Sequence, residues 1–282
     1  MDAVADLTGW TFLVTGANTG IGRATAVDLA RRGGRVFLAA RSEAKTRPVV
    51  DEIRSAYGPR AAEFLQLDLS DLDAVRSSAA EFLQRDDALH VLVNNAGVGG
   101  QRGLTKQGFE IHFGVNHLGH FLLTELLLDR LRASAPARIV NVSSIAHFQA
   151  KGVDFDAVRK STPGVTGLRE YAVSKLCNVL HAQELARRLE GSGVTTYSLH
   201  PGSIASDIWR RIPYPFRLLT KLMKSPEQGA ETSLYCATAP ELETETGKYY
   251  DDCRERRASP VATVELAREL WERSEAFIAT EA

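Results

Sequence analysis

Six short apolar runs alternate with longer amphipathic stretches along this chain, and that alternation limits its fold more than any other feature. Strands that alternate with helices form a parallel sheet with helices on both faces. The sequence therefore predicts α/β architecture: a single doubly wound parallel sheet of the Rossmann type, in one domain over residues 1–282. The runs lie at 11–15, 35–39, 63–67, 90–94, 138–142 and 195–199, and helical patterns at 24–32, 43–57, 71–85, 109–131 and 172–189.

Composition excludes several other classes of protein. With 44% hydrophobic and 24% charged residues, the chain is typical of globular proteins rather than disordered or fibrous ones. Because 34 basic residues face 35 acidic ones, the overall charge gives no argument for a nucleic-acid partner. The 3 cysteines lack ligand spacing, so neither a disulfide framework nor a zinc site is expected. No run of about 18 apolar residues occurs, and we expect a cytoplasmic protein without a signal peptide or a membrane-spanning helix.

A glycine-rich turn follows the first predicted strand. Residues 15–22 read Thr-Gly-Ala-Asn-Thr-Gly-Ile-Gly, and a helical pattern continues from them. Glycines at such a turn let the backbone approach a pyrophosphate, whose charge the N–H groups of the following helix hold. The spacing is Gly-x3-Gly-x-Gly rather than GxGxxG, but its place between strand and helix predicts dinucleotide binding. The candidate residues are Gly16, Asn18, Thr19, Gly20, Ile21 and Gly22.

The motifs that follow resemble the short-chain dehydrogenase/reductase family over nearly the whole chain. Within that family the chain is most similar to the retinol dehydrogenase and WW-domain oxidoreductase branch, through residues 115–124 and 138–144 and the stretches ELARRL and GSGVTTYS. The resemblance implies a nicotinamide cofactor, hydride transfer and a homodimer or homotetramer. In order, the motifs are Asp68-Leu69, Asn94-Asn95-Ala96-Gly97, Asn116, Ser144, Tyr171-Ala172-Val173-Ser174-Lys175 and Pro201-Gly202.

The end of the second predicted strand bears on which nicotinamide cofactor binds. An NAD site uses a carboxylate there for the ribose hydroxyls, whereas residues 39–42 read Ala-Ala-Arg-Ser. Arg41, with Ser42 beside it, can pair with a 2′-phosphate instead. We therefore predict NADP(H) rather than NAD(H). The alternative is that Arg41 is simply solvated at the entrance of a helix.

The resemblance also implies where the rest of the cofactor lies. Asp68 has a second interpretation, because Asp accepts hydrogen bonds from the exposed N–H groups of a first helical turn. The implied contacts are Asp68 and Leu69 beside the adenine, Asn95, Ala96 and Gly97 along the ribose and sheet core, Pro201 and Gly202 beside the nicotinamide, and Ser206 near its carboxamide.

Tyr171 and Lys175 carry the predicted chemistry. They are four residues apart in a helical pattern, so both project from one face about one turn apart. A neighbouring ammonium and an oxidised nicotinamide both favour the phenolate and lower the tyrosine pKa from about 10, which makes Tyr171 usable as an acid or base. By the resemblance, Lys175 also binds the nicotinamide ribose.

The resemblance gives Ser144 and Asn116 supporting roles. Ser144 holds the substrate oxygen, whereas Ser143, offset by one residue, would face the other side of an extended chain. Asn116 links Lys175 to solvent through water, and an Asn inside a helical pattern indicates an unusual backbone. The alternatives are a cap or turn hydroxyl for Ser144 and satisfaction of core polar groups for Asn116.

Two segments interrupt the alternation, at 145–168 and 203–225, and both follow strand ends, where a ligand would bind. The first matches the retinol dehydrogenase branch, and His147 and Phe148 are candidates to line the substrate site unless the segment is a surface excursion. In the second, residues 209–224 are basic and amphipathic. This pattern favours a lid over an apolar substrate, with membrane-surface contact or ordinary packing as alternatives.

Two remaining clusters predict no further site. His117 and His120 lack a third ligand, so we expect no metal. The mixed charges at 251–257 favour solvated surface or a subunit contact. The sequence thus predicts an NADPH-dependent carbonyl reductase or alcohol dehydrogenase for a lipophilic ketone, aldehyde or alcohol. Two rivals are a catalytically silent NADP-binding regulatory protein of the same fold and a nucleotide-sugar epimerase or dehydratase of a longer related family.

Overall fold

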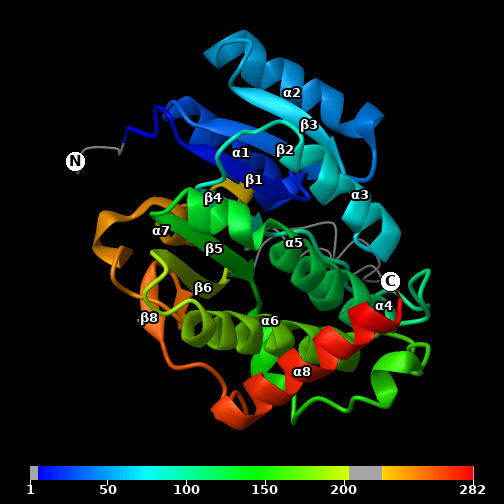
Figure 1. Cartoon of the computed structure of the whole chain (residues 1–282). Helices are drawn as coiled ribbons and strands as arrows, with labels where there is room; N and C mark the ends of the chain where they lie inside the picture. The colour runs from blue at the N-terminus through cyan, green and yellow to red at the C-terminus, as the bar shows by residue number, and fades with distance from the viewer. Residues whose placement is uncertain (1–5, 203–223, 282) are drawn as a thin grey trace.

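The six apolar runs form the first six strands of an eight-stranded sheet in the computed structural model, which describes residues 6–202 and 224–281 (Figure 1). The strand order is β3-β2-β1-β4-β5-β6-β7-β8. All neighbours pair in parallel except β7 and β8, which are antiparallel. The predicted doubly wound sheet is confirmed. The strands are β1 Thr11–Thr15, β2 Arg35–Ala40, β3 Ala62–Gln66, β4 Val91–Asn94, β5 Ala137–Val142, β6 Val194–His200, β7 Lys248–Asp251 and β8 Arg254–Arg256.

The last two strands were not predicted, because they lack the apolar pattern of the other six. β7 buries only its two tyrosines, and all three residues of β8 are exposed. The charged run at 251–257 therefore lies at the solvated edge of the sheet.

The helices fill the intervals between strands much as their patterns predict. One prediction needs correction, since residues 109–131 do not form one helix: Glu110 caps a short α4, and a π-helical turn, η1, separates it from α5. The helices are α1 Gly20–Arg31, α2 Glu43–Tyr57, α3 Leu72–Leu83, α4 Ile111–Phe113, η1 Gly114–Leu118, α5 Gly119–Ala133, η2 Ile145–Gln149, η3 Ala157–Arg159, α6 Leu168–Arg188, α7 Pro226–Thr238, η6 Pro240–Leu242 and α8 Val264–Thr280.

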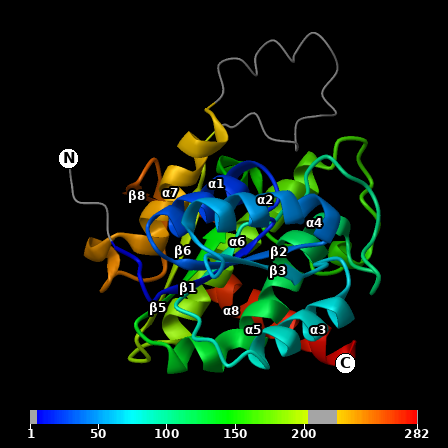
Figure 2. The ribbon, with the colours of Figure 1, turned by 90° about the horizontal axis from the view of Figure 1, so that it is seen from above.

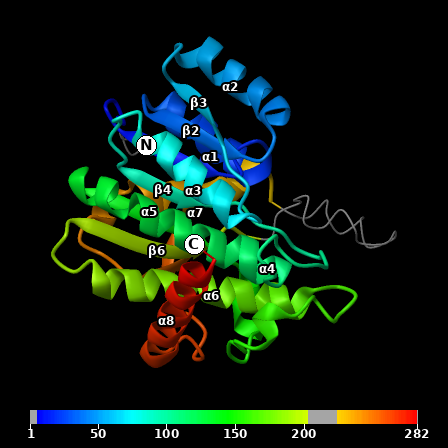
Figure 3. The ribbon, with the colours of Figure 1, turned by 45° about the vertical axis from the view of Figure 1, so that its right-hand side comes forward.

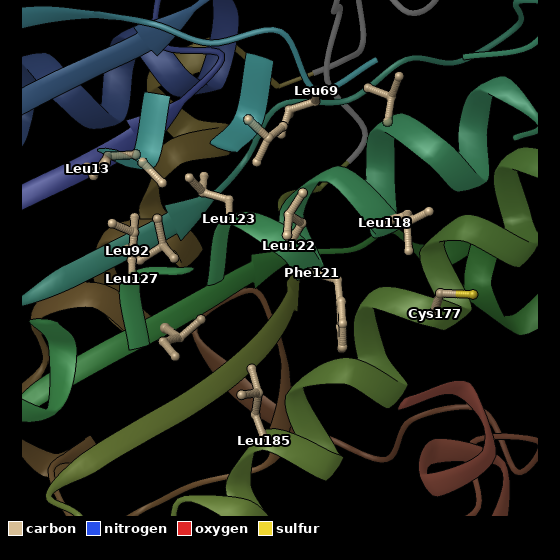
Figure 4. Packing of buried hydrophobic residues seen from close by; sticks show 14 of the residues in the cluster. Leu13, Leu69, Leu92, Leu118, Phe121, Leu122, Leu123, Leu127, Cys177 and Leu185 are labelled. Carbon is tan, nitrogen blue, oxygen red and sulfur yellow. The ribbon is translucent and has the colours of Figure 1, made fainter. Parts of the chain in front are cut away.

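Two hydrophobic cores lie on opposite faces of the sheet. Helices lie on both sides of the strands (Figure 2). Helices α1, α2 and α7 cover one face, while α3, α5 and α6 cover the other, and α8 packs outside against α6 (Figure 3). On the second face, Leu122, Leu123 and Leu127 of α5 lie between the strands and α6 (Figure 4). Within 6–202 and 224–281, no helix has both the length and the apolar character that crossing a membrane requires.

The parallel strands bring the predicted site residues to one edge of the sheet. The glycine turn follows β1, Asn95 follows β4, Ser144 lies two residues after β5 and Pro201 follows β6. Carboxyl ends of parallel strands lie at the same edge, where open α/β sheets bind ligands. The candidate site therefore lies at this edge of the sheet.

Candidate active site

The glycine turn leaves an open approach to the first turn of α1. Gly20 has φ of +55°, which other residues rarely adopt, and nothing lies within 4 Å of the place a Cβ would occupy. At Gly22 a Cβ would lie 2.5 Å from the carbonyl oxygen of Gly16, so this position requires glycine for packing. Thr19 precedes α1 without a side-chain cap, and the first turn has no acidic residue. The first N–H groups of α1 are thus available to an anion.

A cleft of about 490 Å³ opens beside this turn along the carboxyl ends of the strands. Most of the predicted cofactor residues share its wall, which extends from the glycine turn to the face of α6. The predicted residues in the wall are Gly16, Asn18, Thr19, Gly20, Ile21, Gly22, Arg41, Asp68, Leu69, Asn95, Ala96, Gly97, Tyr171, Lys175 and Pro201.

Arg41 occupies the end of the cleft nearest β2. Its side chain is exposed and makes no ion pair with any residue in the described part of the chain. Glu43 is the nearest acid along the chain, and it pairs with Arg47 on the next turn of α2. Ser42, predicted to bind beside Arg41, is instead the N-cap of α2 and accepts from Lys45 N–H, so it does not line the cleft.

Asp68 lies in the cleft wall and is not the helix cap. Its carboxylate accepts from the N–H and the hydroxyl of Ser70, at 2.9 and 2.6 Å. The cap of α3 is Asp71, which accepts from Asp73 N–H at 3.0 Å. The helix-capping alternative for Asp68 is therefore wrong.

Asn95 fastens the β4 end of the cleft to the glycine turn. Its side-chain amide donates to the carbonyl oxygen of Thr15 at 2.8 Å. The Thr15 hydroxyl in turn accepts from the N–H groups of Asn95 and Ala96, each at 2.9 Å. The two loops that would hold the cofactor are thus one hydrogen-bonded unit.

Tyr171 and Lys175 project from α6 into the cleft. The Lys175 Nζ lies 5.7 Å from the centre of the Tyr171 ring and donates to the carbonyl oxygen of Val142 at 2.9 Å. Burial lowers the pKa of Lys175 to about 8. Burial also raises the pKa of Tyr171, and a hydrogen bond with the Ser144 side chain opposes that shift. This direction differs from the expected lowering, because desolvation of the phenol is the larger effect.

Ser144 and Ser143 face different partners, as the offset of one residue predicts. The Ser143 hydroxyl is buried and donates to the carbonyl oxygen of Lys175 at 2.6 Å, although other atoms of Ser143 reach the cleft wall. Ser144 is half-buried, and its hydroxyl contacts Tyr171 and accepts from Ala146 N–H at 3.2 Å. Of the two hydroxyls, Ser144 is the one beside the phenol.

Asn116 lies behind the cleft in the π-helical turn, where the sequence predicted an unusual backbone. Its Oδ1 accepts from Val98 N–H at 2.7 Å, and its Nδ2 donates to Val98 O and to the Ser174 hydroxyl. A Cβ on Gly97 would lie 3.3 Å from that Oδ1 and 3.5 Å from Lys175 Nζ. The missing side chain at Gly97 thus keeps the space between Asn116 and Lys175 open.

Some predicted site residues do not line the cleft, and others lie outside the part of the chain that the structure describes. Gly202 follows Pro201 without lining the cleft, and Ser206 and residues 209–223 lie outside the part of the chain that the structure describes. Phe148 is exposed, whereas His147 is fully buried. The expectation that His147 lines the substrate site is therefore wrong.

His117 and His120 are both buried among packing partners. His117 hydrogen-bonds to Ser274 of α8 at 2.9 Å, and His120 lies between the Thr15 hydroxyl and the carbonyl oxygen of Asn116. Within the described residues, no group of three potential ligands could hold a metal ion.

The cleft wall also contains residues that sequence reasoning missed. Val98, Gln101 and Val115 line it near Asn116, and Pro226 closes it from the start of α7. Val115 begins the stretch 115–124 on which the resemblance rests, but no role was predicted for it. The other three belong to no motif, and Pro226 reaches the site from a helix after the last predicted strand. Only the three-dimensional packing brings these residues to the cleft.

Comparisons with known proteins identify a family and several similar chains. The short chain dehydrogenase family matches residues 11–214. Retinol dehydrogenase 11 of Homo sapiens is 47% identical over 275 residues, which cover 96% of this chain and 86% of that protein. Among solved structures, an uncharacterized protein from Mycobacterium Paratuberculosis has a TM-score of 0.80 at 30% identity, covering 98% of this chain and 96% of that one. The Pseudomonas aeruginosa RhlG/NADP active-site complex has a TM-score of 0.71 at 26% identity, covering 92% and 98%.

Proposed function

The chain belongs to the short-chain dehydrogenase/reductase family, in its retinol dehydrogenase-like branch, and we propose that it is an NADP(H)-dependent oxidoreductase for lipophilic carbonyls and their alcohols. One observation carries the proposal: Tyr171 and the buried Lys175 line a cleft that begins at the glycine turn, and the Ser144 side chain, just outside its wall, hydrogen-bonds to the Tyr171 phenol. A phenol, an alcohol and a cation arranged in this way can orient a carbonyl oxygen and exchange a proton with it.

The chemistry of the cleft fits a nicotinamide dinucleotide. The uncapped first turn of α1 offers N–H groups to a pyrophosphate, and Gly20 leaves room for close approach. Asp68 and Asn95 lie along the path to Tyr171 and Lys175. When bound, the cofactor supplies or accepts the hydride at its nicotinamide C4, while its oxidised ring adds a positive charge that favours the Tyr171 phenolate.

The chain's own groups orient the substrate and move the proton. In the direction of reduction, the Ser144 hydroxyl holds the carbonyl oxygen and Tyr171 gives its proton to that oxygen. Lys175 binds the ribose hydroxyls beside the nicotinamide, and its charge opposes the rise in the Tyr171 pKa that burial causes. The same groups act in reverse during oxidation, with Tyr171 accepting the proton.

The proton that Tyr171 gives away would be replaced through the gap that Gly97 leaves between Lys175 and Asn116. Lys175 Nζ and Asn116 Oδ1 both face the point where a Cβ of Gly97 would lie, at 3.5 and 3.3 Å. A water molecule beside that point can hydrogen-bond to both atoms. Asn116 is itself held rigidly by Val98 and Ser174, so it offers a fixed acceptor to that water.

Exposed apolar side chains support a lipophilic substrate. Among the described residues, seven large hydrophobic side chains are exposed, and four of them lie in the segment that connects Ser144 to α6. These four are Ile145, Phe148, Val165 and Leu168. Exposed apolar side chains concentrated in the segment that follows the proposed catalytic serine favour an apolar ligand. Retinol dehydrogenase 11 bears the name of such a substrate.

The charge at the end of β2 favours NADP(H) over NAD(H). Arg41 is exposed in the cleft wall, while Glu43 is engaged by Arg47. An unengaged guanidinium suits a 2′-phosphate, and no carboxylate lies at the strand end for the hydroxyls of NAD. The RhlG/NADP active-site complex is a related fold with this cofactor, at 26% identity.

The activity is tested by replacing Tyr171. The wild-type protein and Tyr171→Phe are compared for NADPH oxidation with all-trans-retinal, medium-chain aldehydes and hydrophilic glyceraldehyde. Loss of the phenol proton should lower kcat about 1000-fold or more while leaving NADPH affinity within about threefold, because general acid catalysis contributes on the order of 100- to 10,000-fold. Wild-type protein that binds NADPH yet reduces none of these carbonyls would instead support the catalytically silent alternative.

The cofactor preference is tested by Arg41→Asp. We expect the ratio of kcat/KM for NADPH over NADH to fall about 100-fold, because one cation is lost and a carboxylate faces the 2′-phosphate. Lys45→Asp makes the same charge change in the first turn of α2 and is the matched control. An unchanged ratio in Arg41→Asp contradicts the assignment of NADP(H), whatever its effect on kcat.

A further inference from the structure

The imidazole of His147 connects two parts of the chain that are 112 residues apart. Its Nδ1 lies 2.7 Å from the carbonyl oxygen of Ser144, and its Nε2 lies 3.1 Å from the backbone nitrogen of Ser259. The ring has no exposed surface and packs against Phe148 and Tyr249, with ring centres 4.1 and 4.7 Å apart. Both ring nitrogens therefore have hydrogen-bond partners, and the ring is packed beside two aromatic side chains.

These contacts fix the tautomer of His147. A backbone N–H can only donate, so Nε2 must accept from Ser259. The proton of the neutral ring then lies on Nδ1, which donates to the Ser144 carbonyl. Burial lowers the pKa of His147, so the neutral ring with this tautomer prevails at neutral pH.

The Ser144 peptide has little else to hold it. Ser144 is the N-cap of η2 in extended conformation, with φ of −163°, and its hydroxyl is half-buried beside Tyr171. The 3-10 turn that follows holds the Ser144 carbonyl through His147 alone, by its backbone N–H and its ring Nδ1. Rotation of this peptide would turn the Ser144 side chain away from the phenol.

We infer that His147 is a positioning residue: its imidazole fastens the Ser144 peptide to the segment after β8 and thereby holds the Ser144 hydroxyl against Tyr171. The inference rests on the proposed function, in which that hydroxyl orients the substrate oxygen. Since His147 is buried and does not line the cleft, it acts only through Ser144. Ser259 contributes by fixing the tautomer of His147, which leaves the Nδ1 proton for the Ser144 carbonyl.

A double-mutant cycle between His147 and Ser144 distinguishes positioning of the Ser144 hydroxyl from a general contribution of His147 to stability. His147→Phe keeps the aromatic packing and removes both hydrogen bonds. In the wild-type background we expect it to lower kcat about 30-fold with NADPH affinity unchanged, since small displacements of a catalytic group can cost up to about 100-fold. In the Ser144→Ala background, measured in single turnovers, the same change should cost less than about twofold. Equal losses in both backgrounds overturn the inference.

Two conservative variants identify which of the two ring hydrogen bonds supports kcat. The amide of His147→Asn reaches the place of Nδ1 and can donate to the Ser144 carbonyl, whereas that of His147→Gln reaches the place of Nε2 and can accept from Ser259. We expect His147→Asn to recover most of the lost kcat and His147→Gln to recover little. The opposite order would mean that turnover depends on the contact with Ser259 and not on the hydrogen bond to the Ser144 carbonyl, and would also overturn the inference.

Crystal structures of the variants give a readout that needs no turnover. We expect the Ser144 peptide to be rotated in His147→Phe and unmoved in His147→Asn. An unmoved peptide in His147→Phe refutes the positioning role even if the protein reduces no carbonyl. A wild-type protein without activity would refute the proposed function, so the two failures are distinguishable.

Discussion

The glycine turn and the segment after β5 contrast in how their geometry is fixed. The turn is held by residues close in sequence and by its neighbour β4, through contacts such as Gly22 against Gly16. The segment 145–168 is held by partners far along the chain: His147 bonds to Ser259, and Thr162 donates to Glu110. The dinucleotide end of the cleft is thus held by contacts within the turn and by one adjacent strand, at Asn95, whereas the substrate end depends on partners as distant as Ser259.

A pair of glycine substitutions tests this contrast. Of the two, Gly22→Ala should have a large effect on NADPH affinity and Gly164→Ala almost none. In Gly22→Ala the new Cβ would lie 2.5 Å from Gly16 O and from Asn95 Nδ2, so the glycine turn must move. We expect NADPH affinity, measured by titration calorimetry, to fall about 100-fold, which corresponds to the roughly 3 kcal/mol at the upper end of overpacking costs.

Gly164→Ala is the matched change in the segment 145–168. No heavy atom lies within 4 Å of the place its Cβ would occupy, and its φ is outside the positive region. NADPH affinity and kcat should therefore stay within about twofold of wild type, because exposed positions without strain tolerate Ala. Similar losses of affinity in both variants would break the distinction between the two regions.

The same contrast explains how much could be predicted from the sequence. The first six strands and the residues of the glycine turn follow from local pattern, because a buried parallel strand needs an apolar run and the turn needs glycine. Asp68 and Asp71 are three positions apart, and only the structure shows that Asp68 lines the cleft while Asp71 caps α3.

The burial of His147 and the approach of Pro226 could not be predicted, for a physical reason. Each depends on packing between elements that are more than 80 residues apart, such as η2 with Ser259 and the glycine turn with α7. The π-helical turn at Asn116 is an intermediate case. An Asn inside a helical pattern indicated an unusual backbone, but not its form.

The pH dependence of cofactor binding tests the catalytic helix, which joins the two regions. Burial lowers the pKa of Lys175 to about 8, so its ammonium is present below that pH and is lost as the pH rises through it. NADPH affinity should be nearly constant from pH 6.5 to 7.5 and then fall, by up to about tenfold per pH unit. Fluorescence titration from pH 6.5 to 9.5 measures this change.

Lys175→Met provides the control for that titration. It should bind NADPH weakly at every pH and show no break near pH 8, because its side chain cannot titrate. If NADPH affinity still falls near pH 8 in Lys175→Met, another group is responsible for the titration. The wild-type break would then say nothing about how α6 connects the two ends of the cleft.

The smallest expected effect concerns the far anchor of the segment 145–168. Glu110 is buried, and its carboxylate accepts from His112 N–H at 2.8 Å, Phe113 N–H at 3.0 Å, the His112 ring and the Thr162 hydroxyl. Thr162→Val removes one donor of four and keeps the shape, so we expect about 1–2 kcal/mol of lost stability. This corresponds to a Tm lower by roughly 3–6 °C.

Turnover and cofactor affinity should hardly change in Thr162→Val, because His147 still holds Ser144 and the glycine turn is untouched. Thr166→Val, at an exposed threonine of the same segment whose hydroxyl accepts only a long bond of 3.5 Å from Leu168 N–H, is the control and should hardly change Tm. Amide exchange should rise around residues 154–163 and remain slow in α1. If exchange rises equally in both places, the substrate end is coupled to the dinucleotide end, and the local character of the glycine turn is refuted.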